Sequence, residues 1–164
     1  MQGRDLRGGI IMKLNNLQEK EMISKLYEAS RAGVKIQLIV RRICCLGPGL
    51  DKQSENIKVH RIVDRYLEHA RVFVFHNNGE AKYFMGSADW MNRNLHSRIE
   101  VVFPVYEKEL STELEHILQL QLNDDSKAVL LTAELENKRI QAGSGASALA
   151  AQESIYNYVK SLHQ

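Results

Sequence analysis

Two residues of the chain carry side chains that phosphate chemistry needs. Arg41 directly follows the β-branched run 34–40, so it is expected just beyond the end of a strand. Ligands of open α/β sheets gather beyond the carboxyl ends of strands, where a guanidinium can hold two phosphate oxygens at once. His69 lies before another expected strand and beside Arg71, and an imidazole there could donate a proton to a leaving phosphate oxygen. Position alone favours the simpler alternatives, a solvated strand end for Arg41 and a structural histidine for His69.

A polar stretch, 86–94, could complete an anion-binding site. Its small residues would let backbone amides approach an anion, and Ser87 and Asn94 offer neutral hydrogen bonds. Arg98 is expected to open the next strand and would close the ring of positive charge. The alternative for this stretch is an ordinary loop before a helix, with Asp89 as the N-cap residue of that helix.

Other features of the sequence exclude several classes of function. The chain has no GxxxxGK[ST] loop, no protein-kinase motif set and no acidic cluster typical of a metal cage. Its formal net charge of +2 argues against a generic nucleic-acid coat. No window approaches the ~20 apolar residues of a membrane span. The adjacent Cys44 and Cys45 are predicted to be free, structural thiols, as suits a cytoplasmic protein.

The elements that must position these residues alternate between strands and helices. The patterns predict strands at 10–14, 34–40, 57–59, 71–75, 82–85 and 99–103, with Asn78-Gly79 in a hairpin turn. They predict helices at 18–32, 62–69, about 110–118 and 155–162, and loops at 47–56 and 141–147. We therefore predict an α/β fold, a mixed sheet flanked by helices, as a single domain over residues 1–164 with a C-terminal helical tail, 123–164, packed on it.

Five segments, in order along the chain, resemble motifs of bacterial-type polyphosphate kinases. LIVRRICCLGPG (38–49) is similar to LIVRGICCLxPG, SENIKV (54–59) to SENIxV, IVDRYLEHARV (62–72) to IVxRxLEHxRV, SADWMNRNL (87–95) to SADWMxRNL, and RIEV (98–101) to RxEV. The resemblance extends from about residue 13 to residue 131. Arg42 departs from it, because glycine is usual there.

This resemblance implies the last domain of a polyphosphate kinase, with a phospholipase D-like half-domain fold. The N-terminal, head and first catalytic domains would precede it, and ATP would lie between the two catalytic domains. A histidine on the preceding domain would take the γ-phosphate of ATP and pass it reversibly to polyphosphate. His69 would then be a general acid, and Arg41 and Arg98 would bind phosphate.

The resemblance also implies the cofactors and partners. ATP and ADP are expected as substrates, with Mg²⁺ held mainly by the preceding domain. Polyphosphate and the remaining kinase domains are the expected partners, without a specific nucleic acid. Peripheral membrane association is compatible with this assignment, and an oligomer is expected only for the full-length protein.

Two alternatives remain open from the sequence. One is a phospholipase D-like phosphodiesterase or nuclease, in which two copies build a site around a histidine nucleophile. His69-Ala70-Arg71 is only a relative of the HxK signature of that superfamily, with arginine in place of lysine. The other is a polyphosphate-binding module without catalysis. Turnover of ATP and polyphosphate, as opposed to a phosphodiester such as DNA, would separate these alternatives.

Overall fold

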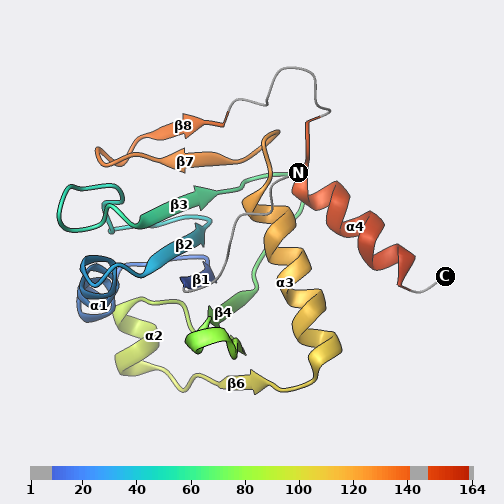
Figure 1. The fold of residues 1–164 in the computed structure, drawn as a ribbon, viewed down its shortest axis with the longest axis horizontal. Coiled ribbons are helices and arrows are strands. Elements are labelled where there is room, and N and C mark those ends of the chain that lie inside the picture. Colours follow the sequence, from blue (N-terminus) through green and yellow to red (C-terminus); the bar gives the residue numbers. More distant parts are fainter. Residues whose placement is uncertain (1–8, 141–147, 163–164) are drawn as a thin grey trace.

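A computed structural model describes residues 9–140 and 148–162, and its centre is an eight-stranded sheet (Figure 1). The strands are β1 (Gly9–Leu14), β2 (Lys35–Val40), β3 (Ile57–Arg61), β4 (Arg71–Phe75), β5 (Lys82–Gly86), β6 (Val102–Val105), β7 (Val129–Leu131) and β8 (Asn137–Arg139). They lie in the order β6-β5-β4-β1-β2-β3-β7-β8. The pairs β1–β2 and β2–β3 are parallel and the others are antiparallel, so the predicted mixed sheet is confirmed.

Helices cover both faces of this sheet. They are α1 (Lys20–Arg31), α2 (Asn92–Ser97), α3 (Lys108–Leu122) and α4 (Ala151–Ser161). Successive residues of β1 point to opposite faces: Met12 packs in one cluster with α1, and Ile11 packs in another with α3. The first cluster contains Ile23 and Leu26 of α1, and the second contains Leu118 and Leu122 of α3. The strands near the centre are therefore buried on both faces and fixed in position.

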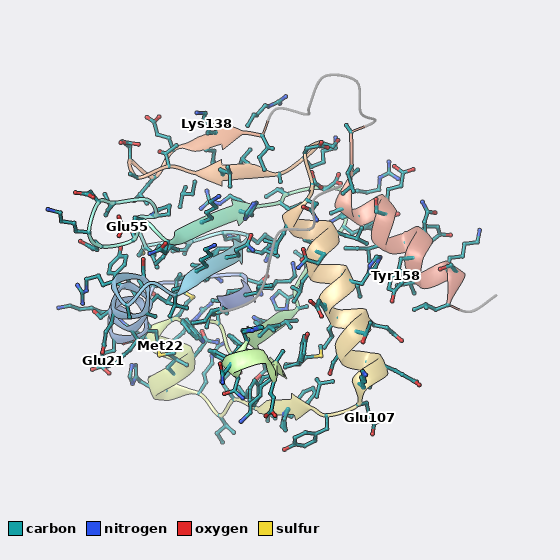
Figure 2. All side chains as sticks on the ribbon, viewed as in Figure 1. Glu21, Met22, Glu55, Glu107, Lys138 and Tyr158 are labelled. Atoms are coloured by element: carbon teal, nitrogen blue, oxygen red, sulfur yellow. The ribbon has the colours of Figure 1, made fainter. Side chains whose placement is uncertain are left out.

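The last helix is attached to α3 and to the end of the sheet. Tyr158 of α4, labelled in Figure 2, contacts His116 of α3, with ring centroids 4.2 Å apart. The buried carboxylate of Asp124 accepts a hydrogen bond from the backbone N–H of Ala128, at 2.9 Å, and another from that of Ala151, at 2.7 Å. This carboxylate therefore connects the start of α4 to the residue that directly precedes β7.

The segment before His69 is not the helix that the sequence pattern predicts. Residues 62–70 have no helical turn, and three apolar residues of this segment, Val63, Tyr66 and Leu67, are exposed. The amide of Gln152 on α4 instead holds both backbone groups of Tyr66, donating to its carbonyl at 2.8 Å and accepting from its N–H at 2.9 Å. Tertiary contacts thus replace the hydrogen bonds that a helix would make.

Other boundaries also differ from the predictions. Residues 123–164 are not wholly helical, because β7 and β8 extend the sheet. The strand predicted at 99–103 is β6, and Pro104 lies within it, where an edge strand tolerates a residue without an N–H. The predicted pairing of 71–75 with 82–85 is confirmed as β4 and β5, joined through a short 3₁₀ turn, Asn77–Gly79. The loop predicted at 141–147 lies outside the described residues.

The two cysteines differ in their surroundings. Cys44 is half-buried, and burial raises the pKa of its thiol, whereas Cys45 is exposed. Both thiols are free, as predicted, but only Cys44 is partly buried, as a structural thiol would be. In the described part of the chain, no helix combines the length and the apolar character that crossing a bilayer demands.

Candidate active site

Four chain segments converge at one edge of the sheet because of its topology. The parallel strands β1 and β2 end there, at Leu14 and Val40. β4 is antiparallel to β1 and so begins there with Arg71, and β5 ends there at Gly86, opposite Arg71. The polar residues that follow β1, β2 and β5, and those that precede β4, therefore meet at the carboxyl ends of the parallel strands. This is the edge at which open α/β sheets bind ligands.

Asp89 lies at the centre of this edge. Its buried carboxylate accepts hydrogen bonds from the backbone N–H of Asn15 at 2.9 Å and of Asn16 at 3.3 Å, and from the amide side chain of Asn16 at 2.9 Å. Burial alone would raise the pKa of Asp89, but hydrogen bonds from Asn16, Arg71 and Asn15 and the charge of Arg71 lower it below its usual value. The N-cap residue of α2 is Met91, so the alternative prediction of Asp89 as an N-cap is wrong.

Arg71 connects Asp89 to His69. Its Nε and Nη2 donate to the two carboxylate oxygens of Asp89, each at 3.2 Å, which gives a bidentate ion pair. Its Nη1 lies 2.9 Å from Nδ1 of His69 and donates to the carbonyl oxygen of the same residue at 2.9 Å. His69 itself is exposed. The predicted catalytic histidine thus stands at the surface, attached to a buried carboxylate through one arginine.

Arg41 belongs to the same network. Its Nε donates to the side-chain oxygen of Asn15 at 3.0 Å, and Asn15 in turn donates its backbone N–H to Asp89. Among the described residues, Nη1 and Nη2 of Arg41 have no hydrogen-bond acceptor. The terminal N–H groups of Arg41 can therefore donate to a ligand. The terminal nitrogens of Arg71, in contrast, already donate to His69 and Asp89.

Ser87 and Asn94 contact a carboxylate that sequence reasoning did not select. Ser87 donates its hydroxyl to Glu100, and Asn94 donates its amide to Glu100 at 2.7 Å. These two hydrogen bonds, and the charges of Arg98 and Arg71, lower the pKa of Glu100. Both residues therefore contact Glu100 in this structure, and direct phosphate binding by Ser87 and Asn94 stays a prediction. The signal for Glu100 was its place in RIEV, two positions after Arg98.

Arg98 lies close enough to influence Glu100 but does not open a strand. It follows α2 in extended backbone, and β6 begins only at Val102, so the predicted position of Arg98 at a strand start is wrong. Its side chain is exposed. Arg41, by comparison, is half-buried.

The side chain of Glu68 anchors the backbone next to His69. The carboxylate of Glu68 accepts from Lys13 Nζ at 2.6 Å, from Gln152 at 3.1 Å and from Gln121. The Lys13–Glu68 ion pair is largely buried, with side chains 8% and 18% exposed. Glu68 therefore holds the segment against β1, α3 and α4 and is not a partner of the His69 ring.

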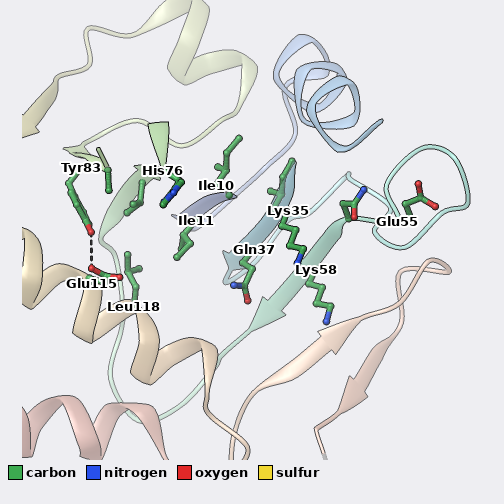
Figure 3. A pocket seen from close by; sticks show the side chains of 15 residues that line it. Ile10, Ile11, Lys35, Gln37, Glu55, Lys58, His76, Tyr83, Glu115 and Leu118 are labelled. Atoms are coloured by element: carbon green, nitrogen blue, oxygen red, sulfur yellow. Dashed lines mark hydrogen bonds between the residues drawn. The ribbon is translucent and has the colours of Figure 1, made fainter. Parts of the chain in front are cut away.

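A cavity of about 360 Å³ lies beside α3, at the other ends of β1 and β2 (Figure 3). Lys35, Gln37 and Lys58 line one part of it, and Tyr83 lines another. Tyr83 donates to Glu115 at 2.9 Å, and burial together with this hydrogen bond raises the pKa of Tyr83 to about 12. None of the five predicted site residues lines this cavity. Within residues 9–140 and 148–162, no three His, Cys, Asp or Glu side chains gather as metal ligands.

Comparisons with known proteins agree with the motifs. Residues 2–152 match the family described as "Polyphosphate kinase C-terminal domain 2". The polyphosphate kinase of Halalkalibacterium halodurans is 54% identical over 121 residues, which are 74% of this chain and 17% of that protein. The polyphosphate kinase of Escherichia coli K12 is 43% identical over 159 residues, which are 97% of this chain and 23% of that protein. The chain thus spans less than a quarter of the length of these relatives.

Solved structures give the same assignment. The crystal structure of polyphosphate kinase from Porphyromonas gingivalis superposes with a TM-score of 0.91 at 46% identity, covering 97% of this chain and 24% of that one. NucT from Helicobacter pylori has a TM-score of 0.58 at 18% identity, covering 71% of this chain and 80% of its own. Nuc from Salmonella typhimurium, a phospholipase D family member, has a TM-score of 0.57 at 13% identity, covering 82% and 84%. The last two show the fold alone, and they confirm the predicted phospholipase D-like architecture.

Proposed function

Because this chain belongs to the polyphosphate kinase family, as its C-terminal domain 2, we propose that it forms one half of the site that transfers the γ-phosphate of ATP to polyphosphate. The other half, including the histidine that is phosphorylated, lies on the preceding domain of the full-length protein. His69 donates a proton or hydrogen bond to the leaving oxygen, and Arg41 and Arg98 bind phosphate oxygens.

The observation that supports this proposal most is the connection of His69 and Arg41 to one buried carboxylate. Arg71 links His69 to Asp89, and Asn15 links Asp89 to Arg41. A donor and a cation are therefore held at the same edge of the sheet by rigid elements. Phosphoryl transfer depends on such positioning and on neutralising charge at the phosphate oxygens, more than on covalent chemistry from every side of the site.

The remaining parts of the proposal concern cofactor and partners. Mg²⁺ accompanies the nucleotide and is held mainly by residues of the preceding domain, and its chemistry is to neutralise phosphate charge. ATP, ADP and polyphosphate are the substrates, in the cytoplasm, and an oligomer forms only through the full-length protein. The fold shared with Nuc and NucT does not by itself bring phosphodiesterase activity to this chain, because fold alone does not determine function.

Conservative replacement of the two proposed phosphate-binding arginines tests this function. In a full-length polyphosphate kinase that ends in this domain, we expect Arg41→Lys and Arg98→Lys each to raise the KM for ATP or polyphosphate roughly tenfold. Lysine keeps the charge but loses the two-pronged guanidinium contact. The measurement is steady-state kinetics with each substrate varied in turn.

Arg139→Lys is the matched control, because Arg139 lies exposed on β8, a sheet edge remote from β1 and β4. It should leave both KM values unchanged. If Arg41→Lys and Arg98→Lys behave like this control, they do not bind phosphate. Cleavage of plasmid DNA by the wild-type protein at a rate similar to ATP turnover would instead favour the phosphodiesterase alternative.

A further inference from the structure

The contacts of Arg71 define which nitrogen of His69 carries the proton. A guanidinium group has N–H donors and no acceptor, so the Nη1–Nδ1 contact of 2.9 Å requires Nδ1 to accept. An imidazole whose Nδ1 accepts is neutral and carries its proton on Nε2. The second bond of Nη1, to the carbonyl oxygen of His69, keeps the guanidinium beside the ring.

Arg71 is itself fixed on its other side. Its bidentate partner Asp89 has a side chain only 5% exposed, and that of Arg71 is 11% exposed. Asp89 is held in turn by N–H groups of Asn15 and Asn16. Turning the guanidinium of Arg71 toward a phosphate would leave this buried carboxylate without its counter-charge, which is costly. Arg71 is therefore suited to hold His69. Arg41, whose terminal nitrogens have no acceptor among the described residues, is suited to hold phosphate.

A protonated His69 does not fit these contacts. Protonation would place an N–H on Nδ1, directly against an N–H of Arg71, and would add a second positive charge beside the guanidinium. A carboxylate on the ring could compensate, but Glu68 is engaged by Lys13, Gln121 and Gln152. Within the described residues the ring nitrogens of His69 contact only Arg71.

We infer that Arg71, held by Asp89, is a positioning residue that presents His69 as a neutral hydrogen-bond donor through Nε2–H. This inference rests on the proposed function and makes it more specific. His69 stabilises the charge that develops on the leaving phosphate oxygen by donating a hydrogen bond, without transferring its proton. Preorganised neutral donors of this kind stabilise developing oxyanions in other enzymes.

The tautomer of His69 can be determined without an activity assay, by nitrogen-detected NMR of the 164-residue chain with ¹⁵N-labelled histidine. At a pH where the ring is neutral, we expect His69 to carry its proton on Nε2 and to have an unprotonated Nδ1 with the shift of a hydrogen-bonded acceptor. Arg71→Met should move the Nδ1 shift toward that of a free ring, while Arg139→Met should not. A proton on Nδ1, or a wild-type Nδ1 shift equal to that of a free imidazole, would overturn the inference.

Replacing His69 with amide side chains of two different lengths, in the full-length enzyme, tests its role as a hydrogen-bond donor. The amide nitrogen of glutamine extends to about the position of Nε2, and that of asparagine only to about the position of Nδ1. We expect His69→Gln to keep turnover within about tenfold of wild type, and His69→Asn to fall to the level of His69→Ala. Turnover of His69→Gln as low as that of His69→Ala would show that proton transfer is required, and would refute the neutral-donor role.

A double-mutant cycle separates positioning from direct phosphate binding. If Arg71 acts through His69, Arg71→Met should lower kcat in the wild-type background, leave the KM for ATP unchanged, and add little in the His69→Ala background. Additive losses, or a raised KM, would make Arg71 a phosphate ligand. The wild-type NMR spectrum and the two amide variants decide the inference even where an Arg71 variant folds poorly. Normal turnover of His69→Ala would refute the proposed function instead, with the tautomer still measurable.

Discussion

Replacement of His69 by alanine in a full-length polyphosphate kinase that ends in this domain is expected to lower kcat by about 10²–10³-fold. Loss of one well-placed donor to a developing oxyanion has an effect of this size, because the donor acts in the transition state more than in the ground state. The KM for ATP should change little, since Arg41 and Arg98 remain. Steady-state kinetics with ATP, and in the reverse direction with ADP and polyphosphate, measure both constants.

His76→Ala is the control for this substitution. His76 lies at the opposite end of the sheet, on the wall of the cavity in Figure 3, and within the part of the chain that the structure describes no hydrogen bond joins it to Asp89. It should keep wild-type turnover. Because the ring of His69 is exposed and, among residues 9–140 and 148–162, hydrogen-bonds only to Arg71, His69→Ala should also unfold at nearly the same denaturant concentration as wild type. A variant that loses stability but keeps turnover would make His69 a structural histidine.

The positions of the main site residues could be predicted because strand ends are readable from sequence. Arg41 follows the run 34–40 and His69 stands just before 71–75, and both runs form strands that meet at one edge. The connections between them could not be predicted. Asp89 is separated from Asn15 by 74 positions, and only the folded sheet brings its carboxylate to these N–H groups. Glu100 was missed for the same reason, since its partners Ser87 and Asn94 come from a loop and a short helix.

The fold was predictable where the hydrophobic pattern of a segment matches the burial of its residues. It was not predictable where contacts with residues far along the chain determine the local conformation. Met12 and Ile11 follow the alternation of a strand covered on both faces, and α1 buries Ile23 and Leu26 at helical spacing. The helix predicted at 62–69 does not form, because Gln152 and Lys13, far along the chain, hold the backbone and Glu68 in an irregular conformation. The strands β7 and β8 have only three residues each, too few to give a period.

Asp89→Ala is expected to destabilise the folded chain by about 3–5 kcal/mol. Removing one partner of a buried ion pair leaves the other charge uncompensated, and here Arg71 would lose both of its carboxylate contacts. The backbone N–H groups of Asn15 and Asn16 would also lose their acceptor. Urea denaturation at neutral pH, followed by circular dichroism, measures the change. A loss below about 1 kcal/mol, the range of an exposed ion pair, would contradict the structural role of Asp89.

The pH dependence of stability gives a second test of how the Asp89 carboxylate contributes to stability. The pKa of Asp89 is lowered in the folded state, so its contribution to stability is present above the unfolded-state pKa and is lost as the pH falls through the folded-state pKa. Wild type should therefore lose stability in acid more steeply than Asp89→Asn, which keeps an acceptor oxygen but has no charge to titrate. Asp51→Asn, at an exposed position in a loop, is the control and should follow the wild-type curve. Identical acid profiles for wild type and Asp89→Asn would contradict the lowered pKa.

Mapping the phosphohistidine of the full-length enzyme is the most direct test of the claim that this chain is the donor half of the site. The enzyme is incubated with γ-labelled ATP, and the acid-labile label is located by peptide mapping under alkaline conditions. The six histidines of this chain are His60, His69, His76, His96, His116 and His163. We expect the label on a histidine outside residues 1–164, and no label on the isolated chain under the same conditions. Stoichiometric phosphorylation of any of these six histidines would contradict the account, because this chain would then supply the phosphoryl acceptor itself.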